Sequence, residues 1–97
     1  MKNQVLCVGV VGFGTIGQQV ALKLLAGIPG LALSAVTSGD ANKARGIMAT
    51  MDIDVPVVEL EALVECVDIV VECAPTAAFT KIATAAIEAH CTLVTVS

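Results

Sequence analysis

The chain has 97 residues, with five basic and nine acidic side chains that give a net charge of -4. This length suffices for one domain with one modest core. The acidic balance excludes nucleic acid or an anionic membrane surface as the main partner, since both require a basic patch. Apolar residues make up 57% of the chain, but they form no run of about 18 that could cross a membrane. We expect a parallel sheet covered on both faces, and in addition a surface covered by another domain or subunit.

The glycine-rich segment near the N-terminus is the most informative part of the sequence. An apolar run over residues 4–11 predicts a central strand, and a helical pattern begins directly after the turn that ends this run. The turn carries glycines at positions 12, 14 and 17, in the spacing GxGxxG. In a strand–turn–helix context this spacing predicts a dinucleotide cradle.

Each glycine of the turn has its own expected role. Gly12 allows the tight turn, Gly14 lets a pyrophosphate approach the backbone, and Gly17 brings the helix close to the sheet. The N–H groups of Thr15 and Ile16 then point towards the phosphates, with the helix dipole behind them. A glycine-rich turn without a ligand is the weaker interpretation, because strand, spacing and helix all agree.

The end of the second strand, expected over residues 31–37, is where such domains distinguish NAD from NADP. An acidic side chain about 20 residues beyond the motif usually binds the ribose 2′-hydroxyl of NAD. Here Ser38 stands close to that place and Asp40 follows slightly later, where it is also suited to cap the next helix. Ser38 with the nearby Lys43 and Arg45 could instead accept a 2′-phosphate. The sequence therefore leaves both cofactors open.

The remaining segments continue an alternation of strands and helices. Residues 55–58 form a short apolar run, and we expect it at the sheet edge because Pro56 cannot donate to a ladder. This agrees with a doubly wound, Rossmann-like parallel sheet of order 3-2-1-4-5, in which the third strand is outermost. The other expected elements of this α/β dinucleotide-binding domain of residues 1–97 are a helix over 59–66, a strand over 67–73, a helix over 77–89 with Thr76 as N-cap, and a strand over 92–97.

The fourth strand runs into Cys73, Ala74 and Pro75, at the carboxyl edge where ligands of open α/β sheets bind. We expect Glu72 at the rim of this crevice, where it caps a helix, accepts backbone hydrogen bonds or shapes the cofactor site. The four cysteines have no metal-ligand spacing, so no metal site is predicted. Reduced thiols in a cytoplasmic protein are their expected state.

Taken together, these segments resemble the N-terminal domain of the L-aspartate dehydrogenase family, which is related to the cofactor domains of homoserine dehydrogenases. The resemblance is carried by GFGTIGQQVALKLLAGIPGLALSAVTSGD, PVVELEAL, VDIVVECAP and LVTVS. It implies an oxidoreductase that interconverts L-aspartate and iminoaspartate with NAD or NADP, in nicotinamide cofactor biosynthesis. The cofactor-binding residues that it implies are Gly12, Gly14, Thr15, Ile16 and Gly17 at the pyrophosphate, Ser38 and Asp40 near the adenosine ribose, and Ala74 and Pro75 on the nicotinamide side.

The same resemblance implies that the catalytic and substrate-binding residues belong to a later segment. No catalytic residue is therefore assigned in this chain, and we expect it to bind cofactor without turnover. The complete protein is expected to add a C-terminal substrate and dimerisation domain and to form a homo-oligomer. Two alternatives stay open: the cofactor domain of a dehydrogenase for homoserine, a semialdehyde or a cyclic imine, and a non-catalytic dinucleotide-sensing module. One departure is His90, which stands where the family tends to have glycine.

Overall fold

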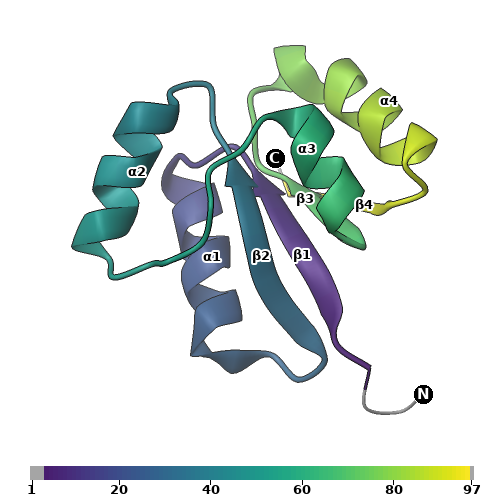
Figure 1. Ribbon diagram of the computed structural model, residues 1–97. Coiled ribbons are helices and arrows are strands. Elements are labelled where there is room, and N and C mark those ends of the chain that lie inside the picture. Colours follow the sequence, from purple (N-terminus) through teal and green to yellow (C-terminus); the bar gives the residue numbers. More distant parts are fainter. Residues whose placement is uncertain (1–3, 97) are drawn as a thin grey trace.

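A four-stranded parallel sheet flanked by helices forms the frame of the domain (Figure 1). The computed structural model describes residues 4–96. The strands are β1 (Leu6–Val11), β2 (Leu31–Thr37), β3 (Ile69–Glu72) and β4 (Thr92–Thr95). The helices are α1 (Thr15–Gly27), α2 (Ala41–Thr50), α3 (Leu60–Cys66) and α4 (Phe79–Glu88), with a short 3-10 turn, η1 (Thr76–Ala78), before α4. Within residues 4–96, no helix is both long and apolar enough to span a membrane.

The strands lie in the order β2-β1-β3-β4, which confirms the predicted doubly wound arrangement for four of its five strands. Residues 55–58, predicted as the outermost strand, lie beside β2 as expected but form only one parallel bridge, between Val57 and Val36. In this bridge, Val36 N donates to the Pro56 carbonyl (3.0 Å) and Val58 N donates to the Val36 carbonyl (2.8 Å). The preceding ladder bond would need an N–H at Pro56, which proline lacks, so pairing ends there.

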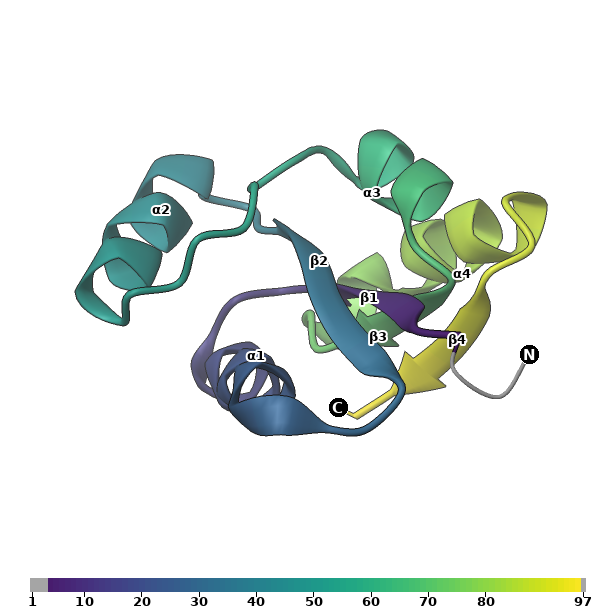
Figure 2. The ribbon, with the colours of Figure 1, turned by 60° about the horizontal axis from the view of Figure 1, so that its bottom comes forward.

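The helices cover the two faces of the sheet unequally (Figure 2). α1 lies on one face, whereas α3 and α4 lie side by side on the other. Alternation along the strands divides the core accordingly, because successive side chains point to opposite faces. One buried cluster joins Val8 and Val10 of β1 to Ala21 and Leu24 of α1, and a second places Val70 of β3 against α3 and α4.

One part of the α1 face is left uncovered. A groove of about 380 Å³ lies between α1 and the strands β3 and β4, here called the α1–β4 groove. Its lining is apolar except for Lys23 and includes Leu24, Ile28, Val71 and Val94. Val94 is 42% exposed. The sheet therefore presents an apolar surface of the kind that composition alone predicted.

Two helices end in left-handed residues that are not glycine. Asp52 follows α2 with φ 59° and His90 follows α4 with φ 62°. After α4, His90 N donates to the Ile87 carbonyl (3.0 Å) and Cys91 N donates to the Ala86 carbonyl (2.9 Å). This pair of bonds is the Schellman motif, in which glycine is the preferred residue at the position of His90.

The boundaries of the last two elements differ from those predicted. α4 begins at Phe79, and no side chain caps its N-terminus in the described structure, so the prediction of Thr76 as N-cap is wrong. Thr76 instead opens η1, because Pro75 before it is extended (φ -58°, ψ 150°) and the chain first tightens into a 3-10 turn. β4 ends at Thr95, and Ser97, the last residue of the predicted strand, lies outside the described residues.

Candidate functional site

The turn after β1 packs closely against neighbouring backbone at two of its three glycines, Gly12 and Gly17. Gly12 has φ +98°, and a Cβ there would lie 2.8 Å from the backbone nitrogen of Ala74. A Cβ on Gly17 would overlap the carbonyl oxygen of Gly12 and lie 3.0 Å from its carbon. Both positions therefore favour glycine strongly, the first for its backbone conformation and the second for the close approach of α1.

Gly14 differs from both of them. Its φ of -80° is open to any residue, and a Cβ there would meet nothing within 4 Å. Packing within the chain therefore gives no reason for glycine at this position. Gly14 lines a cleft, so the bare backbone faces open space where a ligand can come close.

The N-terminus of α1 faces the same region. The first hydrogen bond of the helix runs from Gln18 N to the Gly14 carbonyl (2.9 Å), so the N–H groups of Thr15, Ile16 and Gly17 precede the intrahelical ladder. In the described structure, no side chain caps this end and its first turn carries no acidic residue. The positive end of the helix dipole is therefore open to an anion.

The cleft has a volume of about 660 Å³ and lies at the carboxyl ends of β1, β2 and β3. All of the predicted cofactor residues line it except two. The side chain of Ile16 is 50% exposed outside the cleft, and Gly17 is buried beneath the turn. The residues that the structure does bring together are Gly12, Gly14, Thr15, Ser38, Asp40, Ala74 and Pro75.

A second hollow of about 420 Å³ adjoins the cleft. The two share a rim made of Gly12, Ser38, Gly39, Ala74 and Pro75. They lie where the strand order turns back, between the carboxyl ends of β1 and its neighbours β2 and β3. This switch point is where open α/β sheets bind ligands.

The turn after β2 is held by hydrogen bonds between residues that are close in sequence. Asp40 caps α2 as predicted, since its Oδ1 accepts from Lys43 N at 3.1 Å. Lys43 lines the cleft. Arg45 does not, because its guanidinium donates to the Asn42 Oδ1 (3.2 Å) and the Val57 carbonyl (3.4 Å). Of the two basic residues that the sequence offered, only Lys43 is therefore available to a ligand in the cleft.

Glu72 and Cys73, at the end of β3, lie in different environments. Glu72 is 1% exposed and does not line the cleft, so its expected position at the crevice rim is wrong. The alternation of β3 places it on the face of Val70, which packs towards α3 and α4. Cys73 does line the cleft, and burial together with the Glu72 carboxylate raises the pKa of its thiol to about 11. At neutral pH this thiol is protonated and is a poor nucleophile.

Some residues of the cleft were not predicted from sequence. Phe13, Gln18, Ala44 and Ile47 also line it, and Gln18 Nε2 donates to the Phe13 carbonyl at 3.1 Å. Helical spacing could have predicted that Gln18 lines the cleft, because it lies four residues, or about one turn, after Gly14 and therefore on the same face of α1.

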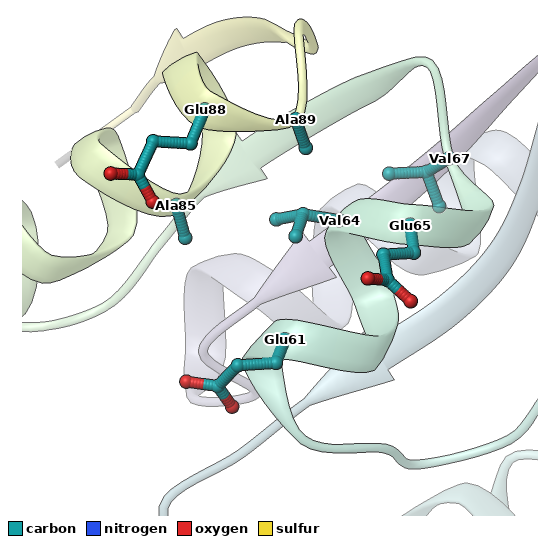
Figure 3. Close-up of a pocket in the computed structure, with 7 residues that line it drawn as sticks. All are labelled: Glu61, Val64, Glu65, Val67, Ala85, Glu88 and Ala89. Carbon is teal, nitrogen blue, oxygen red and sulfur yellow. The ribbon is translucent and has the colours of Figure 1, made fainter.

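Another groove, of about 440 Å³, lies between α3 and α4 (Figure 3). Val64 and Ala85 lie between the two helices, and Glu61, Glu65 and Glu88 surround them. Three carboxylates repel a phosphate, so this groove is unsuited to a dinucleotide. Among residues 4–96, no group of three or more His, Cys, Asp or Glu side chains is arranged to hold a metal ion.

Fold and cleft together define a doubly wound dinucleotide-binding domain. The chain belongs to the family described as "Homoserine dehydrogenase, NAD binding domain", whose sequence model matches residues 12–97. It is 38% identical over 82 residues to "L-aspartate dehydrogenase 3" of Bordetella bronchiseptica, an alignment that covers 84% of this chain and 30% of that protein. These matches confirm the resemblance predicted from the sequence, and with it an NAD(P)-binding domain of the oxidoreductase class.

Solved structures share the fold. Apo scyllo-inositol dehydrogenase from Lactobacillus casei matches with a TM-score of 0.82 and 18% identity, over 98% of this chain and 29% of that one. The myo-inositol dehydrogenase from the same organism, in complex with NAD(H) and myo-inositol, matches with a TM-score of 0.83 and 22% identity, over 95% of this chain and 28% of that one. The chain thus spans less than a third of the length of each of these proteins.

Proposed function

We propose that the chain is the cofactor-binding part of an NAD(P)-dependent dehydrogenase that oxidises L-aspartate to iminoaspartate. The observation that carries the binding function is the open space at Gly14, in front of the uncapped N-terminus of α1. The identity to L-aspartate dehydrogenase 3 supports the choice of substrate.

Different residues of the cleft bind the pyrophosphate, the adenosine ribose and the nicotinamide of the cofactor. The N–H groups of Thr15, Ile16 and Gly17 hold the pyrophosphate, which the bare backbone of Gly14 allows to come close. Ser38 and Asp40 lie at the adenosine ribose, and Ala74 and Pro75 line the nicotinamide side. When bound, the cofactor supplies the hydride acceptor, and this chain's own part is to bind and orient it. No residue of the chain is proposed as catalytic, and we expect the chain alone to show no turnover.

The unit formed by residues 1–97 is proposed to work with a substrate-binding and dimerisation domain in a homo-oligomer. The apolar α1–β4 groove supports such a covering partner, because parallel sheets occur almost only with both faces covered. The relatives are also about three times as long as this chain, which covers 30% of one and 29% of another. Residence in the cytoplasm stays a prediction from the cysteine content.

A second substrate is favoured by one observation. The description of the matching family names homoserine dehydrogenase, so homoserine is the alternative substrate that we consider for the complete protein. Supplying the full-length gene product with L-aspartate and with homoserine, and following NAD(P)H absorbance, separates the two. Faster reduction of the cofactor with homoserine would overturn the proposal of aspartate but not the binding function.

Cofactor binding is tested on the chain itself, by titration with NADH and NADPH and detection of the cofactor's fluorescence. The chain contains no Trp or Tyr, so the protein contributes little to the signal. We expect Gly14→Ala to weaken binding at least roughly tenfold, because the methyl group keeps the pyrophosphate from the backbone donors. Far-UV circular dichroism of the variant should stay unchanged, since the Cβ meets nothing within 4 Å.

Gly46→Ala is the matched control. Gly46 is also open within 4 Å, but it lies in α2 and does not line the cleft. Binding should be the same as that of the parent chain. Failure of the parent chain to bind either cofactor would remove the proposal, and unchanged binding by Gly14→Ala would show that the pyrophosphate does not approach this loop.

A further inference from the structure

We propose that the cleft selects NADP(H) over NAD(H), and that Lys43 is the residue that determines this specificity. The inference rests on the proposed cofactor function and names the cofactor that this site prefers. It concerns the turn between β2 and α2, where the 2′ position of the adenosine ribose lies in doubly wound domains.

The tip of β2 carries no carboxylate. Ser38 stands there, with its hydroxyl donating to the Asp40 carbonyl (3.3 Å) and accepting from Asp40 N (3.2 Å). A neutral hydroxyl of this size leaves room for a phosphate, whereas a carboxylate would repel it. The usual acceptor for the 2′-hydroxyl of NAD is thus replaced by a group that tolerates a 2′-phosphate.

Among the described residues that line the 660 Å³ cleft, Asp40 is the only carboxylate, but it caps α2. Its Oδ1 accepts from Lys43 N at 3.1 Å, as the N-cap of the helix. The N-terminal end of the helix dipole partly offsets the negative charge of this carboxylate. Asp40 is therefore oriented by its own helix, and its repulsion of a nearby phosphate is reduced.

Lys43 provides the positive charge. It is the only basic side chain among the described residues that line the 660 Å³ cleft. Arg45, two residues later on the same helix, is held outside by its bonds to Asn42 and Val57. A 2′-phosphate carries up to two negative charges, so an ammonium group beside it favours NADP(H), whereas the uncharged 2′-hydroxyl of NAD(H) gains far less.

The test is a pair of fluorescence titrations with NADPH and NADH on the parent chain and on Lys43→Gln. A charge-assisted contact of this kind predicts NADPH binding roughly tenfold tighter than NADH. In Lys43→Gln the ratio should fall to about one, through loss of NADPH affinity, while the Kd for NADH stays within about twofold. The control is Arg45→Gln, which removes the same charge from the same helix outside the cleft and should keep the preference.

Asp40→Asn separates the two possible roles of Asp40. The amide keeps an oxygen to accept from Lys43 N but removes the negative charge, so NADPH should bind as well as before or more tightly. A loss of NADH affinity of about fivefold or more in this variant would place the ribose hydroxyl on Asp40 and overturn the inference. Equal affinity of the parent chain for both cofactors would also overturn it and would leave the proposed function standing, whereas binding of neither cofactor removes both.

Discussion

Replacing Gly17 by alanine tests how closely α1 must approach the glycine turn. Gly17 lies in the first turn of α1, and its added Cβ would overlap the carbonyl oxygen of Gly12. The overlapping atom belongs to the backbone, so no side-chain rotation relieves it. Either α1 or the turn must move, and Gly12 is itself held against the backbone of Ala74.

The size of the effect follows from two opposing terms. Forcing an extra methyl group into a packed site costs about 1–3 kcal/mol, while alanine gains up to about 1 kcal/mol over glycine in helix propensity. Because the overlapping atom is backbone, the cost lies in the upper part of this range, at about 2–3 kcal/mol, and we expect a net loss of about 1–2 kcal/mol for Gly17→Ala. At about 4–8 °C per kcal/mol for a domain of this size, the Tm should fall by about 5–15 °C.

The measurement is thermal unfolding followed by far-UV circular dichroism, since the chain has no Trp or Tyr to report tertiary structure. Gly46→Ala in α2 makes the same chemical change where the Cβ meets nothing within 4 Å. It keeps the helix-propensity gain without the overlap, and its Tm should rise by about 4–8 °C. A Gly17→Ala variant that melts at or above the parent chain would refute the argument, because α1 would then not depend on contact with the turn.

Two further predictions concern a helix end and the thiols. His90→Gly should raise the free energy of unfolding, measured by urea titration, by about 0.5–1 kcal/mol, because glycine relieves the left-handed strain at the end of α4. Asp52→Gly should raise it less, since Asp tolerates the left-handed conformation better. A His90→Gly variant that is less stable than the parent chain would contradict this reasoning. At pH 8, iodoacetamide followed by mass spectrometry should label exposed Cys66 first and Cys73 last, because the Cys73 pKa is raised to about 11. Because of that raised pKa, the folded state keeps the Cys73 proton to a higher pH than the unfolded state, in which the thiol has its ordinary pKa of about 9.0. Cys73 should therefore lower the free energy of unfolding as the pH rises from about 9 to 11. Rapid alkylation of Cys73 at pH 8 would contradict the burial of its thiol.

The main elements of the fold could be predicted because they follow from local patterns. Continuous apolar runs identified β1 and β2, and the apolar spacing after the motif identified α1. The missing outer strand shows the limit of such patterns. Pro56 was correctly taken to mark an edge, but the number of ladder bonds that form there depends on which N–H groups point towards β2, and this becomes apparent only when the segment is placed beside Val36.

The candidate site was predictable for a related reason. The carboxyl ends of parallel strands meet at one edge, so residues that follow β1, β2 and β3 had to come together, as Gly12, Ser38 and Ala74 do. Side-chain direction could not be predicted in the same way. Lys43 and Arg45 are equivalent in sequence terms, yet one lines the cleft and the other is tied to Val57 by a contact across 12 residues. Glu72 likewise looked like a rim residue, but it is buried because strand alternation turns it to the α3 and α4 side.

These differences divide the site into two kinds of residue. Gly12 and Gly17 are packed against the chain's own backbone, so changing them alters folding and binding together. Gly14 and Lys43 face the cleft, and at Gly14 an added Cβ would meet nothing within 4 Å, so changing them should alter binding while the fold persists. The motif glycines can be recognised from sequence because the chain's own packing demands most of them. The choice of cofactor depends instead on side chains that the fold leaves free to vary, and Lys43 is therefore the position at which a single substitution should change the cofactor preference without cost to the domain.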